Sequence, residues 1–244
     1  MIVLGFEASG LVASVAIVED NKLLGEYTIN HKRTHSKTLM PMLDELKNRI
    51  EIDLDKIDAI AVASGPGSYT GLRISSSTAK GLGMALNKPI VSIPTMDGLA
   101  YNLWGLKDYI CPIMDARRNQ VYTGVYNFDR DKMHIVKPQS VLDVNDLLSY
   151  LCEMLDESDK VAFLGDGVNL HHDLIIEKLG DRAIFAPGHV NMNKASSIAM
   201  LGIEYLKEGK TEEPNLHRPR YLKLSQAERE RLDSGKGILE PSDG

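Results

Sequence analysis

This sequence has few cysteines and few aromatic residues, and it has no excess of basic residues. Its 244 residues include only two cysteines, Cys111 and Cys152, which are too few and too far apart for a disulfide framework or a zinc site, so we expect two reduced, buried thiols. Aromatic residues make up 6% of the chain, which predicts a mainly aliphatic core. The net charge of −6 argues against a protein that binds nucleic acid on its own, because neutralising phosphates requires a basic surface.

Long apolar segments are missing as well. The chain has no run of 18 apolar residues, and no basic leader with an apolar stretch precedes the first strand pattern at 1–6. We therefore expect a soluble, cytoplasmic protein without membrane contact. The length allows one large domain or two small ones, either of which can bury a core.

The first hundred residues alternate between strand and helix patterns. Strands are predicted over 2–6, 13–18, 23–29, 59–63 and 90–93, and helices over 36–50 and 72–86. In the first helix, Leu39, Leu43 and Leu46 recur at helical spacing. Three strands followed by crossover helices predict a mixed sheet with helices packed on it.

After Trp104 the pattern partly restarts. Strands are predicted over 109–114, 121–128 and 161–164, and helices over 143–155, 170–179 and 195–206. We therefore predict an α/β protein with an N-terminal lobe over 1–103, a C-terminal lobe over 104–224 and a polar tail over 225–244. The helix over 195–206 could pack back on the first lobe. No tight sequence repeat appears, so a duplication stays an open possibility.

A glycine-rich loop at 64–71 is the clearest chemical signal. Gly65, Gly67 and Gly71 lie between a strand and a helix, where backbone N–H groups can turn toward an anion. The loop has no P-loop lysine, and Pro66 and Thr70 stand where a nucleophile elbow needs glycine. A phosphate-facing loop and a tight structural turn both remain possible.

The helix that follows this loop is unusually rich in small residues, which are Gly71, Ser75, Ser76, Ser77, Ala79, Gly81 and Gly83. A glycine inside a helix costs about 1 kcal/mol relative to alanine, so close packing must offset that cost. The packing could lie within the chain or against a helix pair of a partner, with the Met-bearing helix over 36–50 as the second element.

No catalytic set of residues can be assembled from the sequence. His31 and His35 are four apart, but no third ligand accompanies them, so we expect no metal there. The run 115–118 contains Arg117 and Arg118, which could bind phosphate, although internal pairing with Asp115 is the favoured interpretation.

Four pieces of the sequence resemble the TsaB family. The most specific is the glycine-rich stretch 64–74. The others are His35-Ser36 at the start of the first helix, 115–118 with Val121-Tyr122, and Tyr221-Leu222 with 226–229. They occur in the family's order and span most of the chain.

This resemblance implies a two-lobed actin-like, sugar-kinase-like ATPase fold, with mixed sheets and helices packed on them. It also implies a paralogue of TsaD, the catalytic subunit that attaches threonylcarbamoyl to the adenosine next to the anticodon in tRNAs reading codons that begin with A. TsaD-like proteins hold a metal with a His-x-x-x-His pair, and here Thr95 and Leu99 occupy those places. Neither side chain can replace imidazole, so we expect a non-catalytic subunit with no metal site.

The resemblance further implies the partners. TsaB-like proteins pair with TsaD through their first two helices, and TsaE joins with ATP. We expect a homodimer when the chain is alone, no cofactor bound by this chain alone, ATP and a metal in the assembled complex, and tRNA contact only through the complex. The implied interface residues are His35, Ser36, Leu39, Met40, Leu43, Tyr69, Thr70, Arg73, Ser77, Lys80, Gly81 and Met84.

The turn after the first strand departs from the family pattern, because Glu7-Ala8-Ser9 replaces the usual Asp-Thr-Ser. That turn binds nucleotide phosphate in active relatives, so the change weakens the prediction of nucleotide binding. A possible phosphate-facing loop would consist of Ser9, Gly65, Gly67 and Ser68.

Two other functions remain as alternatives. An ATP-dependent small-molecule kinase of the same fold needs phosphate loops in both lobes, and Gly165-Asp166-Gly167 is a faint match for the second. A metallopeptidase needs the metal ligands that Thr95 and Leu99 do not provide.

Overall fold

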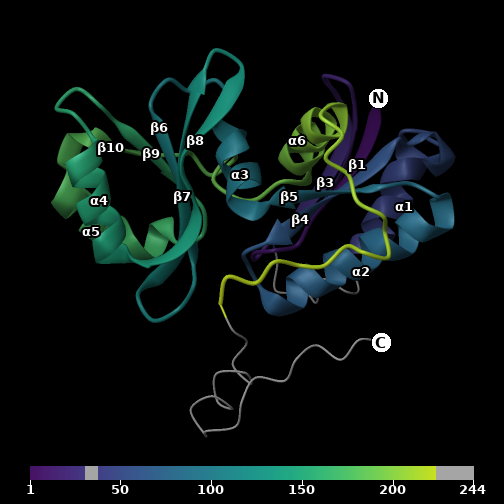
Figure 1. The fold of residues 1–244 in the computed structure, drawn as a ribbon, viewed down its shortest axis with the longest axis horizontal. Helices are drawn as coiled ribbons and strands as arrows, with labels where there is room; N and C mark the ends of the chain where they lie inside the picture. Colours follow the sequence, from purple (N-terminus) through teal and green to yellow (C-terminus); the bar gives the residue numbers. More distant parts are fainter. Residues whose placement is uncertain (31–37, 224–244) are drawn as a thin grey trace, which may run out of the picture.

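The computed structural model describes residues 1–30 and 38–223, which form two lobes side by side (Figure 1). The first lobe contains strands β1 (Ile2–Glu7), β2 (Ala13–Glu19), β3 (Lys22–Ile29), β4 (Ala59–Gly65) and β5 (Ile90–Pro94), and helices α1 (Leu39–Arg49) and α2 (Tyr69–Leu86). The strand order is β3-β2-β1-β4-β5. The β1–β2 and β2–β3 pairs are antiparallel and the others parallel, so the sheet is mixed, as predicted.

The second lobe repeats this arrangement. It contains strands β6 (Tyr109–Asp115), β7 (Gln120–Asp129), β8 (Lys132–Asp143), β9 (Val161–Leu164) and β10 (Ala183–Phe185), and helices α4 (Val144–Met154) and α5 (Val168–Leu179). Its order is β10-β9-β6-β7-β8, which read from the other edge matches the first sheet strand for strand. The two-lobed α/β fold is confirmed, and the matched order supports a duplication that the sequence left open.

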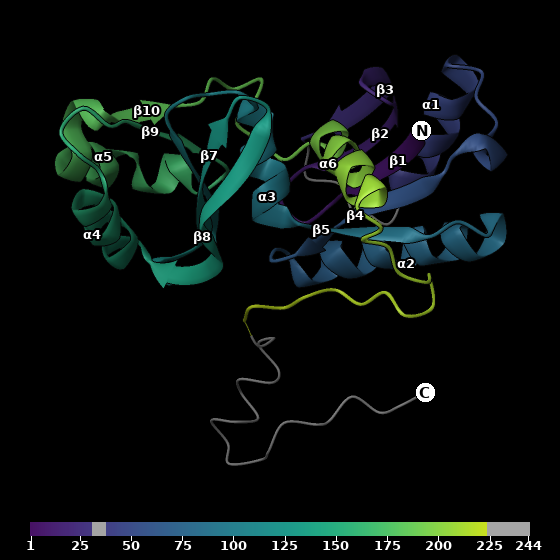
Figure 2. The ribbon, with the colours of Figure 1, turned by 45° about the horizontal axis from the view of Figure 1, so that its top comes forward.

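Each face of the first sheet packs on different helices because side chains alternate along a strand. Leu4 and Phe6 of β1 point toward α1 and α2, and Val3 points to the opposite face. That opposite face is covered by α6 (Ala195–Lys207) and α3 (Thr95–Ala100) (Figures 1 and 2). A side chain on Gly202 of α6 would lie 2.6 Å from the Ala61 Cβ, so the helix sits very close to the sheet.

The stretch 211–223, which we call the C-terminal strap, follows α6 and crosses the molecule. It begins with an antiparallel bridge between Glu212 and Ile90 on β5, and then runs beside α2 (Figure 2). It ends at Lys223, whose ammonium donates to the Ala116 carbonyl and to Gln120 in the second lobe. The strap therefore contacts both lobes.

The structure corrects several predictions. Strand β8 was missed because Met133 to Pro138 lie at a sheet edge without apolar alternation, and proline is tolerated there. Strand β10, with three residues, and helix α3, with six, are too short for a clear periodic signal. Cys111 is buried as expected, but Cys152 is exposed.

No helix among the described residues has the length and apolar character needed to cross a membrane.

Candidate partner-binding face and interlobe loops

Helix α2 presents one face to the core and the other to solvent. The helix begins at Ser68, whose side-chain oxygen accepts a hydrogen bond from the Gly71 N–H at 3.3 Å, and it ends at Asn87 in the left-handed conformation. The core side carries Gly71, Leu72, Ser75, Ser76, Ala79 and Gly83. The outward side carries the predicted interface residues Tyr69, Thr70, Arg73, Ser77, Gly81 and Met84.

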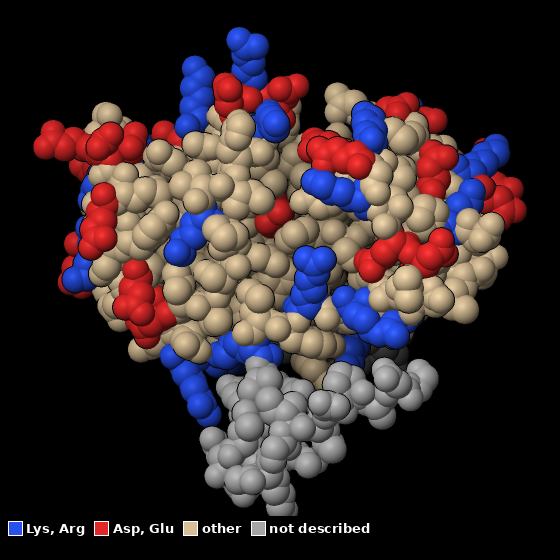
Figure 3. Space-filling model, in the orientation of Figure 1, with Lys and Arg blue, Asp and Glu red and all other residues tan. Residues whose placement is uncertain are grey.

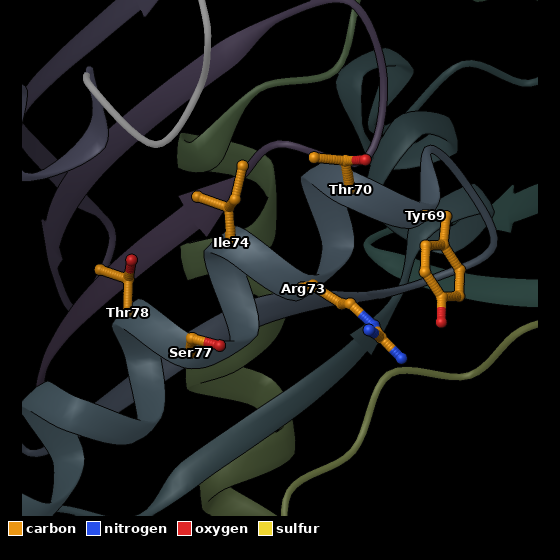
Figure 4. A pocket seen from close by; sticks show the side chains of 6 residues that line it. All are labelled: Tyr69, Thr70, Arg73, Ile74, Ser77 and Thr78. Carbon is orange, nitrogen blue, oxygen red and sulfur yellow. The ribbon is translucent and has the colours of Figure 1, made fainter.

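A shallow groove of about 480 Å³ follows this outward side, lined by Tyr69, Thr70, Arg73, Ile74, Ser77 and Thr78. Figure 4 shows these side chains in two rows along the helix, four residues apart within each row. Gly81 extends one row, and a Cβ on it would meet no described atom within 4 Å. Since no contact among the described residues requires glycine there, packing within that part of the chain does not explain this part of the small-residue helix.

An aromatic and cationic cluster closes the N-terminal end of the groove. The rings of Tyr69 and Tyr221 lie 4.8 Å apart, and the Arg73 guanidinium stacks 4.2 Å from the Tyr69 ring centre. The Arg73 Nε also donates to the Tyr221 hydroxyl at 3.3 Å. The strap therefore contacts Arg73, so Tyr221 lies against the glycine-rich stretch although 148 residues separate it from Arg73.

Helix α1 contributes less to this face than predicted. Met40 is 46% exposed, but Leu39 and Leu43 are each 1% exposed and pack in the core beneath the sheet. The two leucines are therefore removed from the predicted interface, because their side chains cannot reach a partner. His35 and Ser36 lie outside the described residues.

Lys80 is also engaged within the chain. Its ammonium donates to the backbone carbonyls of Asn215 and His217 at 3.2 and 3.4 Å, so it fastens the strap to α2. Beneath it the His217 ring is fully buried, with Nε2 2.9 Å from the Ser76 hydroxyl and Nδ1 2.9 Å from a Glu212 oxygen. The strap was missed by sequence reasoning because it has no periodic pattern.

The predicted phosphate-facing loop is filled by the chain itself. The Ser68 N–H donates to the Ser9 carbonyl at 2.6 Å, and a side chain on Gly67 would overlap that same carbonyl. Gly65, with φ of 114°, faces the Arg220 carbonyl just as closely. Because the Ser68 N–H already donates to the Ser9 carbonyl, it does not point toward a site where a phosphate could bind. This favours the tight structural turn over the phosphate-facing loop.

A buried carboxyl group lies under this loop. Glu7 is fully buried, and its Oε1 accepts hydrogen bonds from the Ser9 N–H and hydroxyl at 2.6 and 2.5 Å. Its Oε2 has no partner among the described residues. Burial raises the pKa of Glu7 to about 7, while the Ser9 hydrogen bonds act in the opposite direction.

Helix α3 carries the two positions at which the resemblance places metal ligands in TsaD. Thr95 and Leu99 are both buried there. Between them Asp97 accepts a hydrogen bond from the Tyr126 hydroxyl of the second lobe at 2.8 Å, and burial raises the pKa of Asp97. Within residues 1–30 and 38–223, no group of three His, Cys, Asp or Glu side chains is placed to hold a metal ion.

In the second lobe the internal pairing of the 115–118 run is confirmed. The Arg117 guanidinium lies 3.5 Å from an Asp115 oxygen, and the Arg117 N–H donates to the same carboxylate. Asp166 of the faint phosphate-loop match accepts from the Asp115 N–H at 3.0 Å. A hydrogen bond thus joins the 115–118 loop to the 165–167 loop.

Comparison with known proteins decides the family. The family model of TsaD, tRNA N6-adenosine threonylcarbamoyltransferase, matches residues 22–231. The Bacillus subtilis protein TsaB is 34% identical over 97% of this chain and 100% of its own length. The chain belongs to the TsaB family, within the wider TsaD family. The Escherichia coli TsaB is 24% identical over 91% of this chain and 95% of its own.

Other relatives of the TsaB-family chain place its fold. The structure of YeaZ from Pseudomonas aeruginosa superposes with a TM-score of 0.74 at 23% identity, covering 91% of this chain and 99% of that one. A tRNA N6-adenosine threonylcarbamoyltransferase from Fervidobacterium nodosum is 37% identical over 117 residues, which is 35% of that enzyme's length. The TsaB-family chain thus shares its whole length with TsaB proteins and a part with the transferase.

Proposed function

We propose that this chain is a non-catalytic subunit of the machinery that makes threonylcarbamoyladenosine in tRNA, and that it binds TsaD through the outward face of α2. The relatives named TsaB from Bacillus subtilis and Escherichia coli support a role in that biosynthesis. The observation that carries the binding proposal is the groove on α2, together with Gly81 one turn beyond Ser77, which has open space around it. Small residues along an exposed helix allow a second helix to approach closely.

The non-catalytic role is supported by the residues of α3. Thr95 and Leu99 offer no imidazole at the two places where the resemblance expects metal ligands in TsaD. In this proposal TsaD supplies the transfer chemistry, with ATP and a metal in the assembled complex, and TsaE joins the pair. tRNA is then held through the complex, and the chain alone self-associates by the same face.

The kinase alternative has less support. A kinase of this fold needs backbone N–H groups that hold nucleotide phosphates. Here the Ser68 amide bonds to the Ser9 carbonyl, and the Asp166 carboxylate bonds to the Asp115 amide. Turnover of a nucleotide by the purified chain would favour this alternative.

The binding proposal is tested by adding bulk to the groove. Gly81→Leu and Ser77→Leu should each raise the dissociation constant for TsaD by at least about tenfold, which corresponds to about 1.4 kcal/mol, because the side chain fills space needed by the partner helix. Ser149→Leu, on the exposed side of α4 in the other lobe, serves as the matched control.

Binding is measured by calorimetry, and function by reconstitution with TsaD, TsaE, ATP, threonylcarbamoyl-adenylate and a tRNA transcript. The two α2 variants should lose most modified adenosine, whereas Ser149→Leu should not. Circular dichroism should show that both variants are folded, with little change in melting for Ser77→Leu and equal or higher melting for Gly81→Leu, since both sites are exposed and leucine is the better helix former. Normal TsaD binding by both variants would refute the proposed interface, and tRNA modification by the chain alone would refute its non-catalytic role.

A further inference from the structure

The outward face of α2 and the part of the strap that runs beside it, 214–223, are rich in basic residues, whereas the start of the strap carries Glu212 and Glu213. The stretches 69–86 and 214–223 contain five Lys or Arg residues and no Asp or Glu, although the whole chain has a net charge of −6. The cations are Arg73, Lys80, Arg218, Arg220 and Lys223. Figure 3 shows Lys and Arg side chains where α2 and the strap cross the molecule, with acidic side chains toward its outer ends and others close to these cations.

Arg73 lines the groove, and Lys80 and Arg218 lie near one another because both donate to the carbonyls of Asn215 and His217. Arg73 and Lys80 are seven residues apart on α2, which places them on one side of the helix two turns apart. Figure 4 shows Arg73 pointing from the groove toward the strap. The pKa of Lys80 is lowered, first by burial and then by the nearby charge of Arg218. Arg218 and Arg220 are both exposed. The groove therefore has a positive border.

Helix α1 does not offset this charge. Its exposed carboxylates are already paired within the helix, Asp44 with Lys47 at 3.2 Å and Glu45 with Arg49 at 3.9 Å. Two copies of this chain that met through their α2 faces would bring Arg73 and Lys80 of both copies into one interface, and α2 carries no acidic residue to offset them. Like-charge juxtaposition at an interface costs affinity and slows association.

We propose that this basic border selects a partner helix surface that carries carboxylates, and that it makes pairing of the chain with a second copy of itself weaker than pairing with that partner. The proposal rests on the proposed function, since it names the chemistry of the TsaD surface that α2 binds. A charged surface that repels one partner and attracts another increases the difference between the two binding affinities, and so it lets a chain distinguish between related partners.

The two dimers should respond to salt in opposite directions. Salt screens exposed charges, so raising NaCl from about 50 to about 500 mM should tighten self-association several-fold and weaken the complex with TsaD several-fold. Sedimentation equilibrium of the full chain measures the first constant, and calorimetry with TsaD the second.

Charge reversal gives an independent test. Arg73→Glu should weaken TsaD binding by at least about tenfold and strengthen self-association, because the new carboxylate on one copy would face Lys80 and Arg218 on the other. Arg73→Gln should have intermediate effects. Lys132→Glu, a change at an exposed residue on β8, is the matched control with the same change of charge. Thermal melting checks that each variant is folded.

The outcomes separate the two proposals. Failure of the unaltered chain to bind TsaD would refute the proposed function, and the salt dependence of self-association would still test the charge selection. Binding of TsaD that is insensitive to salt and equal in Arg73→Glu and Lys132→Glu would refute the charge selection alone. Self-association that weakens with salt would also refute it. If the chain stays monomeric, the salt dependence of TsaD binding decides.

Discussion

Glu7 should make the stability of this protein depend on pH in an unusual direction. Its carboxyl group is fully buried, and burial raises its pKa from 4.5 to about 7 in the folded state. The folded state therefore binds more protons than the unfolded state between these two values. The contribution of Glu7 to the free energy of unfolding is therefore largest below pH 4.5, and it is lost as the pH rises through about 7. Most paired carboxylates give the opposite slope.

The size of the effect follows from the pKa shift. One pKa unit corresponds to about 1.4 kcal/mol, so ionising Glu7 in place costs about 3 kcal/mol at pH 8. The Glu7→Gln variant keeps an oxygen that can accept from the Ser9 N–H and hydroxyl, and it resembles the protonated acid. We expect a difference below about 1 kcal/mol between the two proteins at pH 5, and a gain of up to about 3 kcal/mol, or roughly 6–12 °C in melting temperature, for Glu7→Gln at pH 8.

Urea unfolding of both proteins from about pH 5 to 8.5 measures this difference. Glu177→Gln, on the exposed side of α5, is the control and should follow the unaltered protein at every pH. Parallel pH profiles for Glu7→Gln and the unaltered protein would show that Glu7 does not titrate in this range. A loss of stability at pH 8 would show that the ionised form is needed for the fold.

Further substitutions test the packing of α2. Gly71→Ala should destabilise the protein by about 1–3 kcal/mol, because the new Cβ would overlap the Ala8 carbonyl. The same change at Gly81 should stabilise it by about 0.5–1 kcal/mol, since the space there is open, and equal urea midpoints for the two variants would contradict this account. His217→Ala removes a fully buried ring bonded to Ser76 and Glu212, so it should cost about 2–3 kcal/mol and speed tryptic cleavage after the exposed Arg220. An unchanged cleavage rate would show that His217 does not hold the strap.

Local patterns predicted most of the regular elements. The leucines of α1 and α4 recur at helical spacing, and the apolar runs of β1 and β4 fill strands buried on both faces, so both kinds of element follow from periodicity. The same periodicity could not say which side of α1 meets the sheet. Leu39 and Met40 are neighbours in sequence and both apolar, yet one is buried and the other is 46% exposed.

The sequence by itself determined the alternation of strands and helices, the small-residue character of α2 and the identities of Thr95 and Leu99, because these are properties of neighbouring residues. Only the tertiary structure decided that the Ser68 N–H donates to the Ser9 carbonyl and that the strap binds α2. It also decided that Glu7 is buried with one carboxylate oxygen that has no partner among the described residues. Each of these depends on contacts between residues far apart in the chain. Such contacts are set by how the sheet, the helices and the strap pack together, and no local pattern encodes them.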